Sequence, residues 1–386
     1  MYSAIFGSGL GHVTRVFAIA KILEKYSGCE FVYSSFDEAY DFLKRYSQEV
    51  HYSPSIAVKW NLAGGFSGNS TIIGFPNTFA GFSRQVSFER KKISDYNPRV
   101  ILSDSRLSAV LAAKSLSYPV ITILNQIRIL FPPRFREGLL SAGLETLGAD
   151  FLGLLWSLSD EVLIPDLPPP FTISEANVSH VDIANRVHFT GFMTPKLSVA
   201  EEKISKARSV LQLDSRPVVF MQISGPNATK EAFIRPALES ASVLSRRFNV
   251  IISKGLPSES TVPTRLANGT WIYDWCPIKD ELFLLSDVLV ARAGHTTISQ
   301  CINAGKPSIL VPIFNHSEQI WNAQKFSKLG LGIEIRSEHL TAKELQSAVD
   351  MCEDDSSYAD NISKLKQVSD KFDGTEEAVN IVKGFL

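Results

Sequence analysis

Short apolar runs alternate with amphipathic segments along most of this chain of 386 residues. In the first third, the apolar runs predict buried strands at residues 2–6, 30–34, 99–102 and 119–124. Between them, Val13–Lys25 carries apolar residues at positions 16, 19, 20 and 23, the spacing of an amphipathic helix. Helices are also predicted at 37–46 and 107–116. Strands that alternate with helices indicate a parallel sheet with right-handed crossovers.

The second half of the chain repeats this alternation. The pattern predicts strands at 217–223, 250–253, 270–273, 288–291 and 308–311, and helices at 230–246, 296–304 and 375–385. Pro195 follows a further strand at 187–191, and we place the domain boundary near 191–195. The prediction is an α/β protein with two Rossmann-like domains, residues 1–190 and 191–374. A C-terminal helix, 375–386, is expected to pack back on the first domain. Because ligands bind outside the carboxyl ends of such strands, we expect a cleft between the two domains.

Composition limits the class of protein. Hydrophobic residues make up 45% and charged residues 20% of the chain, as in soluble globular proteins, and the formal net charge of -1 argues against a nucleic-acid partner. The four cysteines show no CxxC spacing, which fits a reducing compartment and predicts no zinc site. No secretory signal is visible, and no apolar run approaches the roughly 18 residues of a membrane span. We therefore expect a cytoplasmic protein.

The first candidate for chemistry is a glycine-rich turn after the first strand. It reads Gly7-Ser-Gly-Leu-Gly11-His12 and leads into the helix at 13–25. Such a turn could be a dinucleotide fingerprint, but the second strand ends in Ser34 and Ser35 rather than in the acid that this reading requires. His12 is expected to face the ligand side. It is either a histidine that satisfies a backbone group at the helix start or a general base.

Asp104 strengthens the catalytic interpretation of His12. It lies just past the strand at 99–102 and before a helix, so it is predicted on the same ligand side of the sheet as His12. An N-cap is the alternative role, because aspartate favours that position. In the functional interpretation, its carboxylate orients His12 and stabilises the protonated imidazole. No serine or cysteine nucleophile stands nearby in an elbow motif, so His12 would act on an external hydroxyl.

The second half offers a set of candidates for holding a ligand. Ser224-Gly225 follows a strand, and Trp275, before Cys276 and Pro277, could stack on a base or simply belong to the core. Gly294-His295-Thr296-Thr297 opens a helix, whose unpaired N–H groups and dipole suit a diphosphate. Gln300 lies further along this helix, within reach of a ribose diol. Glu318-Gln319 suits the hydroxyls of a sugar. Taken singly, each could equally be solvated surface.

The order of these residues resembles the donor signature of inverting GT-B glycosyltransferases. The matching positions are Trp275-x-Pro277, Arg292-Ala-Gly294-x-x-Thr297-x-x-Gln300, Gly305-x-Pro307, Pro312, Glu318-Gln319 and Asn322-Ala323. They are similar to the bacterial lipid-linked murein N-acetylglucosaminyltransferase family and to plant glucosyltransferases. The stretch Gly-Leu-Gly-His-x-x-Arg at residues 9–15 is typical of uncharacterised archaeal and bacterial relatives.

The resemblance implies a role for each matching residue. A nucleotide-sugar donor, expected to be a UDP-sugar, would stack on Trp275 and pair with the Cys276 backbone. Thr296, Thr297 and the Gly294 backbone would hold its diphosphate, Gln300 its ribose, and Glu318 and Gln319 its sugar. Further donor contacts are implied at Gly11, Ser224, Gly225, Arg292 and His295. His12 would deprotonate the acceptor, oriented by Asp104. Gln300 departs from the family, which usually has glutamate there, and the change bears on donor affinity and nucleotide identity.

The expected reaction inverts the anomeric carbon and needs no cofactor besides the donor. The sequence has no Asp-x-Asp pair, so no metal for the diphosphate is expected. The acceptor, lipid-linked or a small molecule, is expected on the first domain. There Ile127–Arg136 mixes apolar residues with Arg128, Arg134 and Arg136, and Phe75, Phe79 and Phe82 are expected in another loop. These segments are either ordinary core or a peripheral contact with a membrane.

Two alternatives remain open at this stage. A nucleotide-sugar 2-epimerase on the same fold would release an altered nucleotide sugar without any acceptor. A non-catalytic donor-binding or partner subunit would bind the donor without turnover, and Gln300 would fit that loss.

Overall fold

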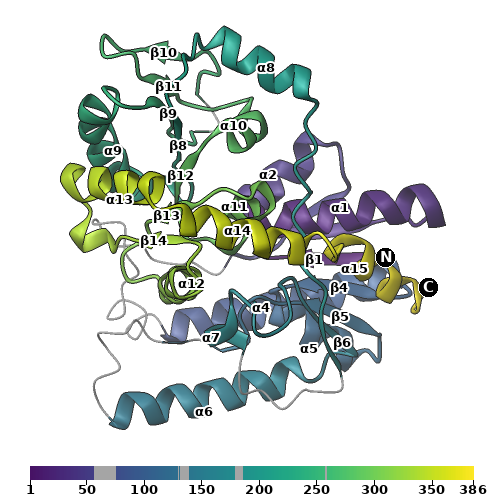
Figure 1. Ribbon diagram of the computed structural model, residues 1–386. Coiled ribbons are helices and arrows are strands. Elements are labelled where there is room, and N and C mark those ends of the chain that lie inside the picture. The colour runs from purple at the N-terminus through teal and green to yellow at the C-terminus, as the bar shows by residue number, and fades with distance from the viewer. Residues whose placement is uncertain (56–74, 129, 131–138, 179–185, 257–258) are drawn as a thin grey trace. The chain divides into compact units, whose positions relative to one another are not determined.

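The chain folds into two compact units, each built on one sheet (Figure 1). The computed structural model describes residues 1–386 except 56–74, 129, 131–138, 179–185 and 257–258; of residues 75–78, 139–146 and 149 it describes the backbone alone. Unit 1 contains the described residues of 1–195 and 372–386, and unit 2 contains those of 196–371. The expected boundary near 191–195 lies beside this division.

The sheet of unit 1 has seven parallel strands in the order β3-β2-β1-β4-β5-β6-β7. The strands are β1 (Tyr2–Ile5), β2 (Val32–Ser35), β3 (Val50–Tyr52), β4 (Ile101–Asp104), β5 (Val120–Ile123), β6 (Glu161–Ile164) and β7 (Val187–Phe189). The four residues of β1, β4 and β5 are all buried, as expected for strands covered by helices on both faces. The strand order reverses between β1 and β4, which pair in register from Tyr2–Ile101 to Ile5–Asp104.

Helices cover both faces of this sheet. They are α1 (Leu10–Ser27), α2 (Asp37–Arg45), α4 (Phe75–Tyr96), α5 (Leu107–Ser115), α6 (Leu139–Trp156), α7 (Glu175–Val178) and α15 (Gly374–Lys383). On one face, Val13 and Val16 of α1 share a core with Val379 and Val382 of α15. The C-terminal helix α15 is therefore part of unit 1.

The sheet of unit 2 also has seven strands, in the order β10-β11-β9-β8-β12-β13-β14. They are β8 (Val218–Gln222), β9 (Asn249–Ser253), β10 (Thr264–Arg265), β11 (Trp271–Tyr273), β12 (Val288–Ala291), β13 (Ser308–Leu310) and β14 (Gly332–Glu334). Only β10 is antiparallel to its neighbour among the described strands. Here the order reverses between β8 and β12.

The helices of unit 2 bury two cores on the faces of its sheet. They are α8 (Glu201–Val210), α9 (Glu231–Leu244), α10 (Lys279–Leu285), α11 (His295–Ala304), α12 (Ser317–Lys328), α13 (Ala342–Asp354) and α14 (Ser356–Ser369), with short 3₁₀ turns at η3 (Asn227–Thr229) and η4 (Ser337–His339). The predicted fold class, two parallel α/β units in tandem, is confirmed.

Some expectations for unit 1 are wrong. Phe75, Phe79 and Phe82 were expected in a loop. They lie instead on helix α4, which begins at Phe75 and ends at Tyr96. Asp104 is the last residue of β4 rather than a residue past its end. Arg134 and Arg136 lie outside the described residues. No helix in the described part of the chain is long and apolar enough to cross a membrane.

Candidate active site

The first site forms at the reversal point of the unit 1 sheet, where β1 and β4 end side by side. Parallel α/β sheets bind ligands at such points. Gly7 lets the loop after β1 pass close to Phe36, the residue between β2 and α2, because a Cβ at Gly7 would come within 2.3 Å of the Phe36 carbonyl oxygen. Gly9 has a φ of 81° and precedes α1. Helix α1 begins at Leu10, so His12 stands in its first turn.

His12 and Asp104 are in direct contact. The Nδ1 atom of His12 lies 2.7 Å from Oδ1 of Asp104. The His12 side chain keeps 22% of its surface exposed, whereas Asp104 is completely buried. The His12 ring also packs edge-on against Phe6, with 5.5 Å between ring centroids. Asp104 does not cap a helix, since α5 begins after Arg106 and no side chain bonds its first turn. The geometry favours the orienting role over the N-cap role.

Arg15 completes this site, and no role for it was expected from the sequence. Its Nε lies 2.5 Å from Oδ2 of Asp104, and its Nη2 lies 2.6 Å from Oδ1. Burial alone raises the pKa of Asp104, but the charge of Arg15, followed by that of His12 and their hydrogen bonds, outweighs burial and holds this pKa below its ordinary value. The sequence did contain one signal for Arg15. It lies three residues after His12, and residues three apart on a helix share a face.

The second set of candidates surrounds the reversal point of the unit 2 sheet, between β8 and β12. Ser224 and Gly225 follow β8, and Gly225 has a φ of 100°, with room for a Cβ limited by Ile313. Gly294 is the N-cap of α11, and no side chain caps the first turn of this helix. Thr296 and Thr297 stand in that turn, both half-buried, while His295 is buried. The structure brings these residues to one end of the sheet.

Gln319 reaches the same helix start from α12. Its Oε1 accepts a hydrogen bond from the Ile313 N–H at 3.0 Å, and its Nε2 lies 3.9 Å from where a Gly294 Cβ would stand. Glu318, its neighbour, is half-buried, and its Oε1 lies 3.5 Å from the Asn322 amide nitrogen. Gln300 is half-buried on α11. The carboxamide nitrogen of Gln319 thus lies near the start of α11.

Trp275 and Cys276 follow β11 at the same end of the sheet. Trp275 is half-buried, and its backbone N–H donates to the Ser260 carbonyl at 3.0 Å. Cys276 is buried, and this burial raises the pKa of its thiol to about 12. The thiol is therefore protonated at neutral pH, and any contact with a base edge would come from the backbone.

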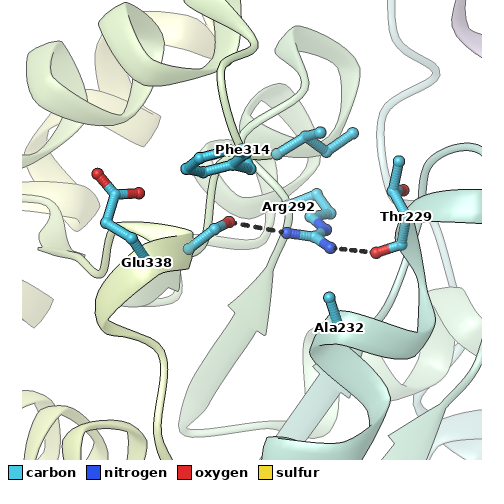
Figure 2. A pocket seen from close by; sticks show the side chains of 7 residues that line it. Thr229, Ala232, Arg292, Phe314 and Glu338 are labelled. Carbon is cyan, nitrogen blue, oxygen red and sulfur yellow. Dashed lines mark hydrogen bonds between the residues drawn. The ribbon is translucent and has the colours of Figure 1, made fainter. Parts of the chain in front are cut away.

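Arg292 has its guanidinium turned into the protein. Nη2 donates to the Thr229 carbonyl at 2.7 Å, a bond that Figure 2 shows as a dashed line. Nη1 donates to the Val311 carbonyl at 3.2 Å and lies 3.5 Å from the Ser337 hydroxyl. Burial lowers the pKa of Arg292 to about 10. The side chain therefore ties together the segments that follow β8, β13 and β14, beside a cavity of about 190 Å³ that Phe314 also lines.

Comparisons with known proteins give both units a family context. Residues 225–377 match the model of the glycosyltransferase family 28 C-terminal domain. An uncharacterized glycosyltransferase of Methanosarcina mazei is 26% identical over 385 residues, covering 96% of this chain and 94% of the relative. The UDP-N-acetylglucosamine–N-acetylmuramyl-(pentapeptide) pyrophosphoryl-undecaprenol N-acetylglucosamine transferase of Streptococcus gordonii is 24% identical over 50% of this chain and 56% of its own length.

The fold comparison extends over the whole chain. The crystal structure of the calicheamicin glycosyltransferase superposes with a TM-score of 0.71 at 16% identity, covering 100% of this chain and 98% of that one. The family model and the full-length relative agree with this fold. The second unit is therefore similar to glycosyltransferase family 28 C-terminal domains, and the whole chain has the GT-B fold of the glycosyltransferase structures that it resembles.

Proposed function

We propose that this glycosyltransferase moves a sugar from a nucleoside diphosphate donor, a UDP-sugar, to an acceptor hydroxyl with inversion of the anomeric carbon. The contact between His12 and Asp104 carries this proposal. An imidazole bonded to a buried carboxylate through Nδ1 has its Nε2 free to accept a proton. Among the described residues, the side-chain hydrogen-bond partners of His12 are Asp104 and Arg15 rather than a serine or cysteine, so the proposal takes the proton from an external hydroxyl.

In the proposed step, His12 Nε2 takes the proton of the acceptor hydroxyl. At the same time, the oxygen of that hydroxyl bonds to the anomeric carbon of the donor sugar. The bond from that carbon to the diphosphate oxygen breaks, and the diphosphate leaves with the electron pair. General-base assistance of this kind contributes about 10²–10⁴ in rate. Asp104 stabilises the imidazolium that forms.

We assign donor binding to the residues at the reversal point of unit 2. The uncapped start of α11 offers N–H groups and a positive dipole end to the diphosphate, with the Thr296 and Thr297 hydroxyls beside it. Gln319 and Glu318 suit the sugar hydroxyls, Gln300 the ribose and Trp275 the base. The proposal needs no cofactor besides the donor.

A screen of nucleotide sugars tests this function. A donor that raises the melting temperature is incubated with candidate acceptor alcohols, and NMR spectroscopy assigns the anomeric configuration of the product. We expect a UDP-sugar to bind and the product to have the opposite configuration at the anomeric carbon. Retention, or release of an altered nucleotide sugar without an acceptor, would contradict the proposal.

We further propose that unit 1 contacts a membrane through helix α6, which would suit a lipid-linked acceptor. Leu147, Phe151 and Leu154 form an apolar stripe on α6, with exposures of 69%, 61% and 66%, and Leu158, just past the end of the helix, is 40% exposed. Residues at these spacings share one face of a helix. The sequence of α6 contains no lysine or arginine, so the attraction here is apolar.

Vesicle sedimentation tests the membrane contact. We expect the protein to sediment with phosphatidylcholine vesicles and the variant Phe151→Ser/Leu154→Ser to lose most of this binding. Val262→Ser, which removes an exposed apolar side chain from unit 2, is the matched control. Equal sedimentation of the α6 variant and the unchanged protein would rule out this surface.

A further inference from the structure

Arg15 is bound to Asp104 more extensively than His12 is. It places two nitrogens on the two carboxylate oxygens, at 2.5 and 2.6 Å, in the forked geometry that a guanidinium shares with a carboxylate. Both side chains are buried, with Arg15 at 6% exposure. A buried charge pair of this kind is costly to assemble unless the geometry is good, and this pair lies directly beside His12.

The fork fixes the direction of the hydrogen bond between Asp104 and His12. A guanidinium only donates, so both oxygens of Asp104 act as acceptors. The bond at 2.7 Å then requires a proton on Nδ1 of His12, and the lone pair resides on Nε2. Arg15 thereby selects the ring form that can act as a base at Nε2.

The charge of Arg15 also limits how strongly Asp104 attracts a proton to His12. A lone carboxylate would favour the imidazolium. Here the cation offsets the anion, and Arg15 Nη2 lies only 3.2 Å from His12 Nδ1. The other charged groups nearby engage elsewhere: Glu38 of α2 contacts the Gly9 N–H at 3.4 Å, and Arg106 pairs with Glu89 of α4.

We propose that Arg15 is a positioning residue for His12. It keeps Asp104 ionised and aligned, it holds the Nδ1–H form of the ring, and its positive charge offsets that of the carboxylate beside the ring. The catalytic consequence rests on the proposed role of His12 as the base. The effect on the ring itself does not.

The test uses ¹⁵N-histidine NMR spectroscopy of the full chain, with His12→Gln to assign the His12 ring. In Arg15→Gln, we expect the ratio of protonated to neutral His12 at about pH 6.5 to rise roughly tenfold, because an unbalanced carboxylate favours the charged ring. Arg45→Gln, which removes an exposed arginine of α2, should leave the ratio unchanged.

Arg15→Lys separates charge from geometry and serves also if Arg15→Gln does not fold. A lysine keeps the charge but bonds the carboxylate at one point. We expect a protonation ratio close to that of the unchanged protein and a mixture of Nδ1–H and Nε2–H rings. Two results would overturn the proposal. One is a His12 ring in Arg15→Lys that stays entirely in the Nδ1–H form. The other is an unchanged ratio of protonated to neutral His12 in folded Arg15→Gln.

Kinetics of the active enzyme provide the second readout. In Arg15→Gln, the acid limb of the kcat profile should move to higher pH, and kcat should fall about 10- to 100-fold, part of the contribution of the base. In Arg15→Lys, kcat should fall while the acid limb stays in place. The expected NMR changes without any sugar transfer would leave the role of Arg15 intact and refute the proposed function. A uniform loss of activity with an unchanged pH profile would make Arg15 merely structural.

Discussion

Asp104 is the residue on which the unit 1 site depends. It closes β4 at the point where the sheet reverses, and its two oxygens serve His12 and Arg15. Sequence patterns predicted His12 and Asp104 because each follows a strand-like run at the ligand end of a parallel sheet. Arg15 could not be assigned in the same way, since its role depends on the distance between α1 and β4, which local patterns do not encode.

Asp104→Asn should change how stability depends on pH. The pKa of Asp104 is lowered in the folded state, so its contribution is complete above the ordinary value of about 3.9 and is lost as the pH falls through the lowered value. At neutral pH we expect Asp104→Asn to be less stable by on the order of 3 kcal/mol, because Arg15 loses its buried partner. Below about pH 4 the two proteins should converge. Thermal melts between pH 3 and pH 7, at about one-unit steps, measure this. Parallel curves would contradict the assignment.

Arg292 would support the proposed donor site through the backbone that it holds in place. Its guanidinium bonds the Thr229 and Val311 carbonyls. We expect Arg292→Met to lower the free energy of unfolding by about 1–3 kcal/mol, because buried carbonyls lose their donor. The donor KM should rise more than kcat falls. Urea unfolding and initial rates measure these effects. Arg336→Met, which changes an exposed arginine of unit 2, is the control. Equal stability of the two variants would argue against the tying role.

At the scale of elements, the start of α1 is set by two glycines that act differently. Gly7 has no space for a Cβ beside Phe36, whereas Gly9 has open space but a φ of 81°. The sequence predicted this turn, because glycines between a strand and a helix mark close approach or a left-handed conformation. Helices α4 and α6 were not predicted. In α6, apolar residues are so frequent that no periodic face stands out.

The two glycines give a matched pair of variants. Gly7→Ala forces Phe36 to move, and we expect a loss of about 1–3 kcal/mol in the free energy of unfolding. Gly9→Ala should lose only about 1 kcal/mol, the penalty for a side chain at positive φ. Gly7→Ala should also reduce activity, since the loop carries His12. Chemical denaturation of both variants checks the order. A more severe loss in Gly9→Ala would contradict the described loop.

At the scale of the whole molecule, two α/β sheets of similar design each have candidate residues at the reversal point of the strand order. The sequence predicted both halves because each strand is a short buried run followed by a turn. The sequence also predicted candidate residues after the strands that flank the reversal point in each sheet. It could not predict the hydrogen bonds that turn Arg292 inward, since these depend on how the segments after three different strands meet. The relatives and the family model agree with this architecture.

Donor binding should stabilise the folded chain by mass action. A ligand that binds only the folded state adds about 2.7 kcal/mol at 100 times its Kd. We expect a UDP-sugar to raise the melting temperature of the unchanged protein and of His12→Gln equally, because the donor residues belong to unit 2. Thermal melts with increasing donor measure this. Loss of the shift in His12→Gln alone would place the donor contacts elsewhere.

The most direct measurement is the transfer rate of His12→Gln against that of the unchanged protein, with the donor identified by the screen. Glutamine can keep a hydrogen bond to Asp104 but cannot serve as a base. We expect a drop in kcat of about 10²–10⁴, with unchanged melting temperature and donor affinity. Near-normal turnover by folded His12→Gln would contradict this expectation.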